Sequence, residues 1–554
     1  MSVDGVSKNK AHFTQSQRQI SLALLPLLGT LLPGVSASAQ VIAADDAIGT
    51  TTDVVGDRID ITGGQLSGDN ANLFHSFENF SVTAEQTANF IAPSPDVQII
   101  VGRVNGGSSS IIDGTLQVSG SEANLYLMNP AGILTGPNAQ LNLPGSFTDT
   151  SSTAIGFEHG EFAADGTTAA STLTGTPETF HFASEQPGAV VNLGELSVKA
   201  GESITLVGGT VVNTSELSAP EGSLTLAAVE GESLVRISQG EQLLSLEVEA
   251  PESDSSSVIN LSSGSSGAML TGREMAPVTA LVTNADGSMS LRGTALGPDS
   301  SREQAIAQTS GHVITTGTLT TQGDIGGDIN VLGTHVTLTD AALNASGTYG
   351  GGSIRVGGDY QGQGPITTAS TTIIDSLSSL SADAVQAGDG GSVITWADSY
   401  TQFAGDISAT GGALGGDGGF TEVSGKIDLA LSGNIDVSAP AGELGNILID
   451  PFNLVITDGA PPPNTVNTSY QSSTATEGLT GNVTITADND ITIEDLSDDE
   501  LLFATGTNVS FIADADGNGS GNFSMNLDDT IRAEQGDIAI SAVNITAGTI
   551  DTST

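Results

Sequence analysis

The sequence predicts an all-β protein, a right-handed parallel β-helix (β-solenoid) preceded by a cleavable signal peptide. The first observation is composition. The 554 residues include 71 glycines and no cysteine, with 38% hydrophobic but only 4% aromatic residues. Aliphatic segments punctuated by glycine are typical of short strands joined by tight turns. The second is that similar short segments recur along the chain, and the third is that helical periodicity is nearly absent after the N-terminus.

The recurring segments begin with a pair of glycines followed by an alternating strand. The pairs lie 25, then 39, then 28 residues apart, at Gly326-Gly327, Gly351-Gly352, Gly390-Gly391 and Gly418-Gly419. Alternation puts the aliphatic side chains on one face of each strand. Short strands with one apolar face can bury that face only if each coil stacks on the next. The uneven spacing then corresponds to loops inserted between coils.

A string of antiparallel sandwich domains is the competing fold. It predicts two-residue hairpin turns and a domain boundary about every hundred residues. The sequence has few Asn-Gly or Asp-Gly hairpin turns, and its only linker-like break is Pro461-Pro462-Pro463. The stacked coil is therefore the preferred interpretation.

Residues 1–39 are predicted to be a signal peptide. Three basic residues precede an apolar stretch over residues 20–32, which is too short and too interrupted by proline and glycine to span a bilayer. Small residues at Ala37 and Ala39 form a cleavage site before Gln40. The chain is therefore expected to be exported, and the absence of cysteine excludes both a disulfide framework and a thiol nucleophile.

The charge of the chain limits its partners. Lysine and arginine number 13 against 64 aspartates and glutamates, a formal net charge of −51. Such an excess repels nucleic acid and anionic membrane surfaces, so no nucleic-acid partner is expected. The composition gives no sign of a cofactor.

The most specific pattern lies within residues 70–156. It contains a turn made by Asn129, Pro130, Ala131 and Gly132, followed by Ile133. An asparagine side chain can bond to its own backbone, proline presets φ, and glycine accepts a positive φ. Strand-like segments flank this turn on both sides, among them residues 72–77, 100–104, 112–116 and 123–128.

In order and spacing, most of residues 41–157 resembles the haemagglutination-activity, or two-partner-secretion, domain of the filamentous haemagglutinin family. The family's N-P-N-G-[IV] motif corresponds to residues 129–133, with Ala131 in place of the second asparagine. This departure keeps the turn but removes one hydrogen-bonding side chain. The family's N-P-N-L motif has no clear counterpart, which leaves the details of partner recognition open.

The resemblance implies a route and a domain plan. A partner outer-membrane transporter, a barrel with periplasmic domains, would carry the chain from the periplasm of a diderm bacterium to the cell surface or the medium. Residues 40–290 would form the two-partner secretion domain (core 41–157) with the first coils. Residues 291–554 would form a β-helix repeat region that is shortened at its C-terminus.

Three function classes follow, in order of preference. The first is a secreted surface adhesin that binds host or cell-surface glycans or proteins, the second a secreted haemolysin or cytolysin, and the third a β-helix enzyme that degrades polysaccharides. The sequence has no G-x-S-x-G elbow, no P-loop and no HExxH, and bases are few in the repeat region. The expectation is therefore that the chain has no catalytic residues and is not an enzyme.

One segment matches part of a calcium-binding loop. Residues 514–519 read Asp-Ala-Asp-Gly-Asn-Gly, which fits the first six positions of D-x-D-x-N-G, but Met525 stands where the bidentate glutamate belongs. A plain turn between coils is the preferred interpretation, and weak calcium binding is the alternative. No metal site is predicted.

Overall fold

The computed structural model describes residues 41–167, 169–236, 247–249, 278–283, 289–293, 304–305, 310–459 and 469–553. The predicted signal peptide and its cleavage site, Ala37, Ala39 and Gln40, lie outside the described residues. Among the described residues, no helix is long and apolar enough to cross a membrane.

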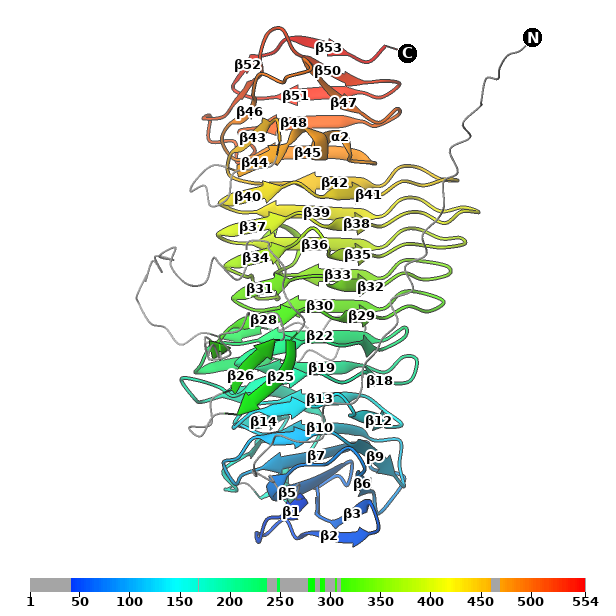
Figure 1. The fold of residues 1–554 in the computed structure, drawn as a ribbon, viewed down its shortest axis with the longest axis vertical. Coiled ribbons are helices and arrows are strands. Elements are labelled where there is room, and N and C mark those ends of the chain that lie inside the picture. The colour runs from blue at the N-terminus through cyan, green and yellow to red at the C-terminus, as the bar shows by residue number, and fades with distance from the viewer. Residues whose placement is uncertain are drawn as a thin grey trace, which may run out of the picture. The chain divides into compact units, whose positions relative to one another are not determined.

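Most of the described strands stack in parallel coils, so the predicted parallel β-helix is confirmed (Figure 1). Sheet I, with 16 strands, forms one face. Its members are β1 (Val41–Ala43), β4 (Gln65–Leu66), β5 (Asn72–Phe80), β7 (Ile99–Val104), β10 (Asn124–Met128), β13 (Phe147–Thr150), β19 (Ile204–Gly208), β22 (Ser223–Ala228), β30 (Asp328–Leu332), β33 (Ser353–Val356), β36 (Ser392–Ala397), β39 (Phe420–Gly425), β42 (Asn446–Ile449), β45 (Asn482–Ala487), β48 (Val509–Ala513) and β51 (Ile538–Ser541).

Sheet II, with 14 strands, forms the second face. Its members are β8 (Ser110–Ile112), β11 (Ile133–Thr135), β17 (Ala189–Asn192), β20 (Thr210–Asn213), β28 (His312–Thr315), β31 (His335–Leu338), β34 (Thr371–Ile374), β37 (Tyr400–Phe403), β40 (Asp428–Leu431), β44 (Ser469–Ser472), β43 (Leu454–Thr457), β46 (Ile491–Ile493), β49 (Asn522–Ser524) and β52 (Asn544–Thr546). The short helix α2 (Ser473–Glu477) follows β44.

The third face is divided into three shorter sheets. The first contains β2 (Thr50–Val55), β3 (Arg58–Gly63), β6 (Thr87–Ile91), β9 (Thr115–Ser119) and β12 (Gln140–Asn142). The second contains β18 (Leu196–Ser197), β21 (Leu217–Ser218), β29 (Thr318–Thr320), β32 (Ala342–Asn344), β35 (Ser379–Ser381), β38 (Asp406–Ser408) and β41 (Asn434–Asp436). The last of these three sheets, which we call sheet III, contains β47 (Glu500–Phe503), β50 (Thr530–Ala533) and β53 (Thr549–Asp551).

Antiparallel pairing among the described strands is confined to three places. At the N-terminal end, β1 and β4 pair with β5, and β2 pairs with β3. Sheet IV consists of β14 (Ala154–Phe157), β15 (Glu161–Ala163), β16 (Pro177–Phe182), β23 (Ser233–Arg236) and β24 (Glu247–Glu249). The third place is β25 (Val278–Thr283), β26 (Met289–Gly293) and β27 (Gln304–Ala305). A string of sandwich domains is therefore excluded for the described chain.

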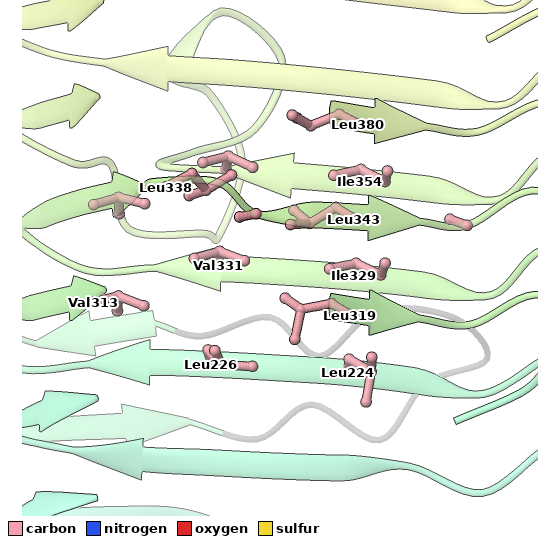
Figure 2. Close-up of a cluster of buried hydrophobic side chains, with 14 of the residues drawn as sticks. Leu224, Leu226, Val313, Leu319, Ile329, Val331, Leu338, Leu343, Ile354 and Leu380 are labelled. Carbon is pink, nitrogen blue, oxygen red and sulfur yellow. The ribbon is translucent and has the colours of Figure 1, made fainter. Parts of the chain in front are cut away.

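Aliphatic ladders fill the interior of the coils. Leu224, Ile329 and Ile354 are in register on neighbouring strands of sheet I, and each is buried (Figure 2). Leu319 and Leu343 are in register on the third face. Full burial of such a side chain contributes about 1.5–3 kcal/mol to stability. Because each coil buries its apolar face against the next, the coils are stable only as a stack.

The inserted loops explain the uneven repeat. Strand β33 pairs with β36 although a loop with the 3₁₀ turn η2 (Tyr360–Gly362) lies between them in sequence. A second 3₁₀ turn, η1 (Ala170–Thr172), lies in the segment between β15 and β16. Strand β22 pairs with β30, although the described strands that lie between them in sequence, β23 to β29, belong to other sheets.

The paired glycines allow consecutive coils to approach closely. A Cβ atom on Gly352 would lie 2.1 Å from the carbonyl oxygen of Gly327 in the preceding coil. We therefore expect Gly352→Ala to lower the free energy of unfolding by about 1–3 kcal/mol, the usual cost of overpacking. Gly350→Ala is the matched control because its nearest contact would be the Cγ2 atom of Ile325 at 3.9 Å. Urea unfolding followed by circular dichroism measures both, and equal midpoints would contradict the steric argument.

Candidate functional site

The turn predicted from residues 129–133 connects β10 of sheet I to β11 of sheet II. The side chain of Asn129 is 1% exposed, and its Nδ2 donates to the carbonyl oxygen of Ser108 at 2.9 Å and to Oγ of Ser110 at 2.9 Å. Its Oδ1 accepts the N–H of Ala131 at 3.0 Å. Asn129 thus closes the turn and joins it to the preceding coil.

Gly132 and Ile133 complete the turn. Gly132 has φ +102°, and a Cβ atom there would lie 2.8 Å from the carbonyl oxygen of Ala189. A side chain would therefore be strained in the backbone and would collide with the next coil. Ile133 is 1% exposed and lies in register between Ser110 and Val190, with its side chain in the core.

Pro130 and Ala131 are the half-buried members of the motif. The carbonyl oxygen of Ala131 accepts the hydroxyl of Ser109 at 2.6 Å. All turn contacts of Ala131 use backbone atoms, so the turn closes without the asparagine that the family motif has at this position. The solvent-facing part of the motif is therefore small and largely apolar.

A buried carboxyl group lies in the same part of the core. Asp149 on β13 is in register between Leu127 and Leu206, both core residues, and is 0% exposed. Its Oδ2 accepts the hydroxyl of Thr135 at 3.4 Å, whereas its Oδ1 has no hydrogen-bond partner. Burial raises the pKa of Asp149 to about 8, so the group is mostly protonated at neutral pH.

The sequence reasoning did not identify Asp149. The signal was present, because alternation in Phe147-Thr148-Asp149 places the carboxyl on the same face as a phenylalanine. Acidic residues are so abundant in this chain that a single aspartate in a strand is not distinctive in the sequence.

Arg103 on β7 joins three elements beneath sheet IV. Its guanidinium is 3.0 Å from Oδ2 of Asp46 and donates to Oγ of Ser76 at 3.0 Å and to the carbonyl oxygen of Ala163 at 2.8 Å. It also lies 4.5 Å from the ring centroid of Phe162. Partial burial alone would raise the pKa of Asp46, but hydrogen bonds with Ser76 and Arg103 outweigh it and lower that pKa. Sequence reasoning missed this network because its members are distant in sequence.

Sheet IV covers part of sheet I with an aromatic cluster. The ring of Phe74 on β5 lies 4.6 Å from that of Phe162 and 5.5 Å from that of Phe157, measured between centroids. Phe180 and Phe182 of β16 belong to the same buried cluster. The N-terminal coils thus have a second core outside the solenoid interior.

The histidines form no constellation of three ligands in the described chain. His75 is buried beside Phe77 and Phe90, and desolvation lowers its pKa to about 3. His312 and His335 stack on adjacent coils with centroids 4.5 Å apart, and burial lowers the pKa of His312 to about 4.

In the calcium-like loop of residues 514–519, the aspartate side chains accept hydrogen bonds from N–H groups close by in the chain. Oδ1 of Asp514 accepts the N–H groups of Gly519 at 2.8 Å and Ser520 at 3.3 Å. Asp516 accepts the backbone and side-chain N–H groups of Asn518 at 3.1 and 2.7 Å. This geometry supports the interpretation of residues 514–519 as a turn between coils.

An open hollow of about 450 Å³ lies at the corner loops of the first coils. Glu122 and Lys199 are the ionisable residues in its wall, and they form an exposed ion pair at 3.7 Å. A single carboxylate cannot provide the acid and the base of polysaccharide hydrolysis. The hollow therefore has no catalytic arrangement of that kind.

The stacked parallel sheets define a parallel β-helix protein, with the buried turn at residues 129–133 in its first coils. Residues 39–274 match the family model of the TPS secretion domain. A TPS secretion domain indicates an exoprotein that a two-partner system exports across the outer membrane of a diderm bacterium.

Two solved structures are similar to this chain. The HMW1 secretion domain from Haemophilus influenzae is 19% identical, with a TM-score of 0.39, and the match covers 73% of this chain and 99% of that chain. The filamentous hemagglutinin secretion domain is 10% identical, with a TM-score of 0.31, and the match covers 93% of this chain and 99% of that chain. No curated protein matches.

Proposed function

We propose that this exoprotein is an adhesin, delivered to the cell surface or the medium by a partner barrel that has periplasmic domains. The match of residues 39–274 to the secretion domain carries the export part of this proposal. The proposed domain plan remains a secretion domain over residues 40–290, with its core at 41–157, followed by β-helix repeats over residues 291–554. The solenoid suits export because its contacts link neighbouring coils, so coils can fold one after another as they emerge.

A series of exposed apolar side chains supports binding through the side of the stack. The glycine-rich loops that follow β29, β32, β35 and β38 project beside one another (Figure 1). Each loop exposes a large apolar residue: Ile325 (61%), Tyr349 (57%), Val385 (59%) and Leu414 (80%). Exposed apolar side chains on successive loops are typical of an interaction surface. The proposed ligands are glycans or proteins of a host or cell surface.

One carboxylate pair that bears on the enzyme alternative, Glu422 and Asp450, is covered by a loop. Glu422 of β39 is 0% exposed, and both of its carboxyl oxygens accept the backbone N–H of Gln361, at 3.0 and 3.2 Å. The side chain of Gln361 donates to Asp450 on the next coil at 3.2 Å. The loop that carries η2 thus closes over both acids, which supports a structural role.

Export is tested in cells that express the chain with or without its partner transporter. We expect the protein in the medium or at the surface only when the transporter is present. The same amount outside in cells that lack the transporter would overturn the proposed route.

Asn129→Ala is expected to reduce export. The substitution leaves the N–H of Ala131 and Oγ of Ser110 without their present partner, which costs about 1–3 kcal/mol in the folded domain. Immunoblots of the medium measure export, and thermal unfolding measures stability. Asn105→Ala is the matched control because Asn105 is an exposed asparagine near the preceding strand of sheet II. Equal export of the two variants would show that the side chain of Asn129 is not needed for secretion.

The secreted protein distinguishes the three function classes. Binding to cells or to immobilised glycans, without lysis or turnover, is the expected result. Lysis of red cells would favour the cytolysin, and release of reducing ends from a polysaccharide would favour the enzyme.

A further inference from the structure

Two acidic turns lie side by side in consecutive coils near β53. One turn leads from β46 to β47, and the other leads from β49 to β50. They have the same backbone form, since the N–H of Asp499 donates to the carbonyl oxygen of Leu496 at 3.1 Å and that of Asp529 donates to Asn526 at 3.3 Å. Parallel pairing of β47 with β50 places Asp499 and Asp529 in equivalent positions, each directly before its strand.

Three carboxylates converge where these turns meet. Oxygen atoms of Asp495, Asp499 and Asp529 all lie within 4.8 Å of one another. Arg532, the one arginine on sheet III, is directed elsewhere and pairs with Glu500 at 2.7 Å and Asp551 at 3.5 Å. No described ion pair neutralises the three acids, so their mutual repulsion is not relieved by a protein base.

Asp529 supplies a second, independent observation. Its side chain is 1% exposed, and its Oδ2 accepts the N–H of Leu496 at 3.2 Å. Its Oδ1 is buried without a hydrogen-bond partner. A buried carboxylate oxygen with no partner is costly unless a proton or a cation occupies it. Desolvation raises the pKa of Asp529, the hydrogen bond from Leu496 opposes this, and the charges of Asp495, Asp499 and Asp528 add to the increase.

We propose that Asp495, Asp499 and Asp529 bind one calcium ion that joins the two coils. All three ligands are carboxylate oxygens, which hard cations prefer, and no nitrogen or sulfur ligand is present for a softer metal. Calcium accepts six to eight oxygens in irregular geometry, and the exposed Asp495 and Asp499 leave room for water to complete the shell. Magnesium requires a near-ideal octahedron, loses its water reluctantly and is usually held by one or two carboxylates, so three carboxylates suit calcium better.

The contrast with residues 514–519 separates this cluster from an ordinary acidic turn. In that loop the oxygens of Asp514 and Asp516 accept N–H groups of the loop itself. In the proposed site, the buried oxygen of Asp529 accepts none. The calcium-like motif of residues 514–519 therefore lies within one coil, whereas turns from two coils form the proposed cation site.

The test uses the full exported chain after removal of divalent cations by a chelator. Calorimetric titration with calcium chloride is expected to show binding with a Kd on the order of 10⁻⁴–10⁻³ M, the range of extracellular calcium modules. Saturating calcium is also expected to raise the thermal unfolding temperature. Asp499→Asn and Asp529→Asn are expected to weaken binding at least tenfold, whereas the matched control Asp516→Asn leaves it unchanged.

A second measurement separates ligation from a structural role. Without calcium, Asp529→Asn is expected to be at least as stable as the wild type because it removes a repelled, buried charge. A large loss of stability in this variant without calcium would show a purely structural residue and overturn the proposal. So would an unchanged calcium response in both ligand variants, equal affinity for magnesium, or no response of the wild type at 10 mM calcium, about ten times the upper Kd.

Discussion

Asp149→Asn is expected to stabilise the first domain at neutral and alkaline pH and to have little effect near pH 4. The neutral amide replaces a carboxyl group that the core keeps protonated, with a pKa of about 8 against 3.8 for a free aspartate. Below pH 4 the carboxyl is protonated in both the folded and the unfolded chain, so the wild type suffers no penalty.

The penalty grows as the pH rises. Between about pH 4 and pH 8 the unfolded chain loses the proton while the folded chain retains it, so wild-type stability falls by about 1.4 kcal/mol per pH unit through this group. Above pH 8 the folded group ionises as well, and the difference becomes constant. At pH 7 the variant is expected to be more stable by about 4 kcal/mol.

Urea unfolding of both proteins at pH 4.5, 6, 7.5 and 8.5 measures this difference. Asp53→Asn is the control because Asp53 is exposed on β2, and its effect should not follow the same curve. A stability difference between Asp149→Asn and the wild type that stays constant over this range would show that the carboxyl is ionised in the fold.

The parallel stack could be predicted because its cause is local. Glycine pairs and alternating aliphatic residues repeat in the sequence itself, and one-faced strands have few ways to bury that face. The turn at Asn129 could be predicted for the same reason, since Asn-Pro-Ala-Gly contains its own turn chemistry.

The antiparallel sheet IV and the acidic site near β53 could not be predicted in this way. Phe157, Phe162 and Phe180 gather only after the chain has folded back over sheet I, so no local pattern shows the cluster. The pairing of Asp499 with Asp529 depends on the length of an inserted loop and on the strand register, which an irregular repeat does not define.

Arg103→Met is expected to lower the free energy of unfolding of the first domain by about 3–5 kcal/mol, the usual cost of breaking a buried ion pair by removing one partner. Methionine occupies much of the apolar volume of the side chain but removes the hydrogen bonds that the guanidinium donates to Ser76, to the carbonyl oxygen of Ala163 and to the carboxylate of Asp46. The contact with the ring of Phe162 is lost as well.

Sheet IV should be the first element affected, because Arg103 is its charged link to sheet I and to the loop that carries Asp46. Limited proteolysis is expected to cut Arg103→Met within residues 158–176 at protease concentrations that leave the wild type intact, and urea unfolding gives the change in stability. Arg58→Met is the matched control. Its guanidinium, 2.7 Å from Asp60, is half exposed to solvent, so its removal should leave the midpoint nearly unchanged. Equal midpoints for the two variants would mean that the buried interactions of Arg103 stabilise the fold no more than the Arg58 pair does. Cleavage outside sheet IV would show that another element unfolds first.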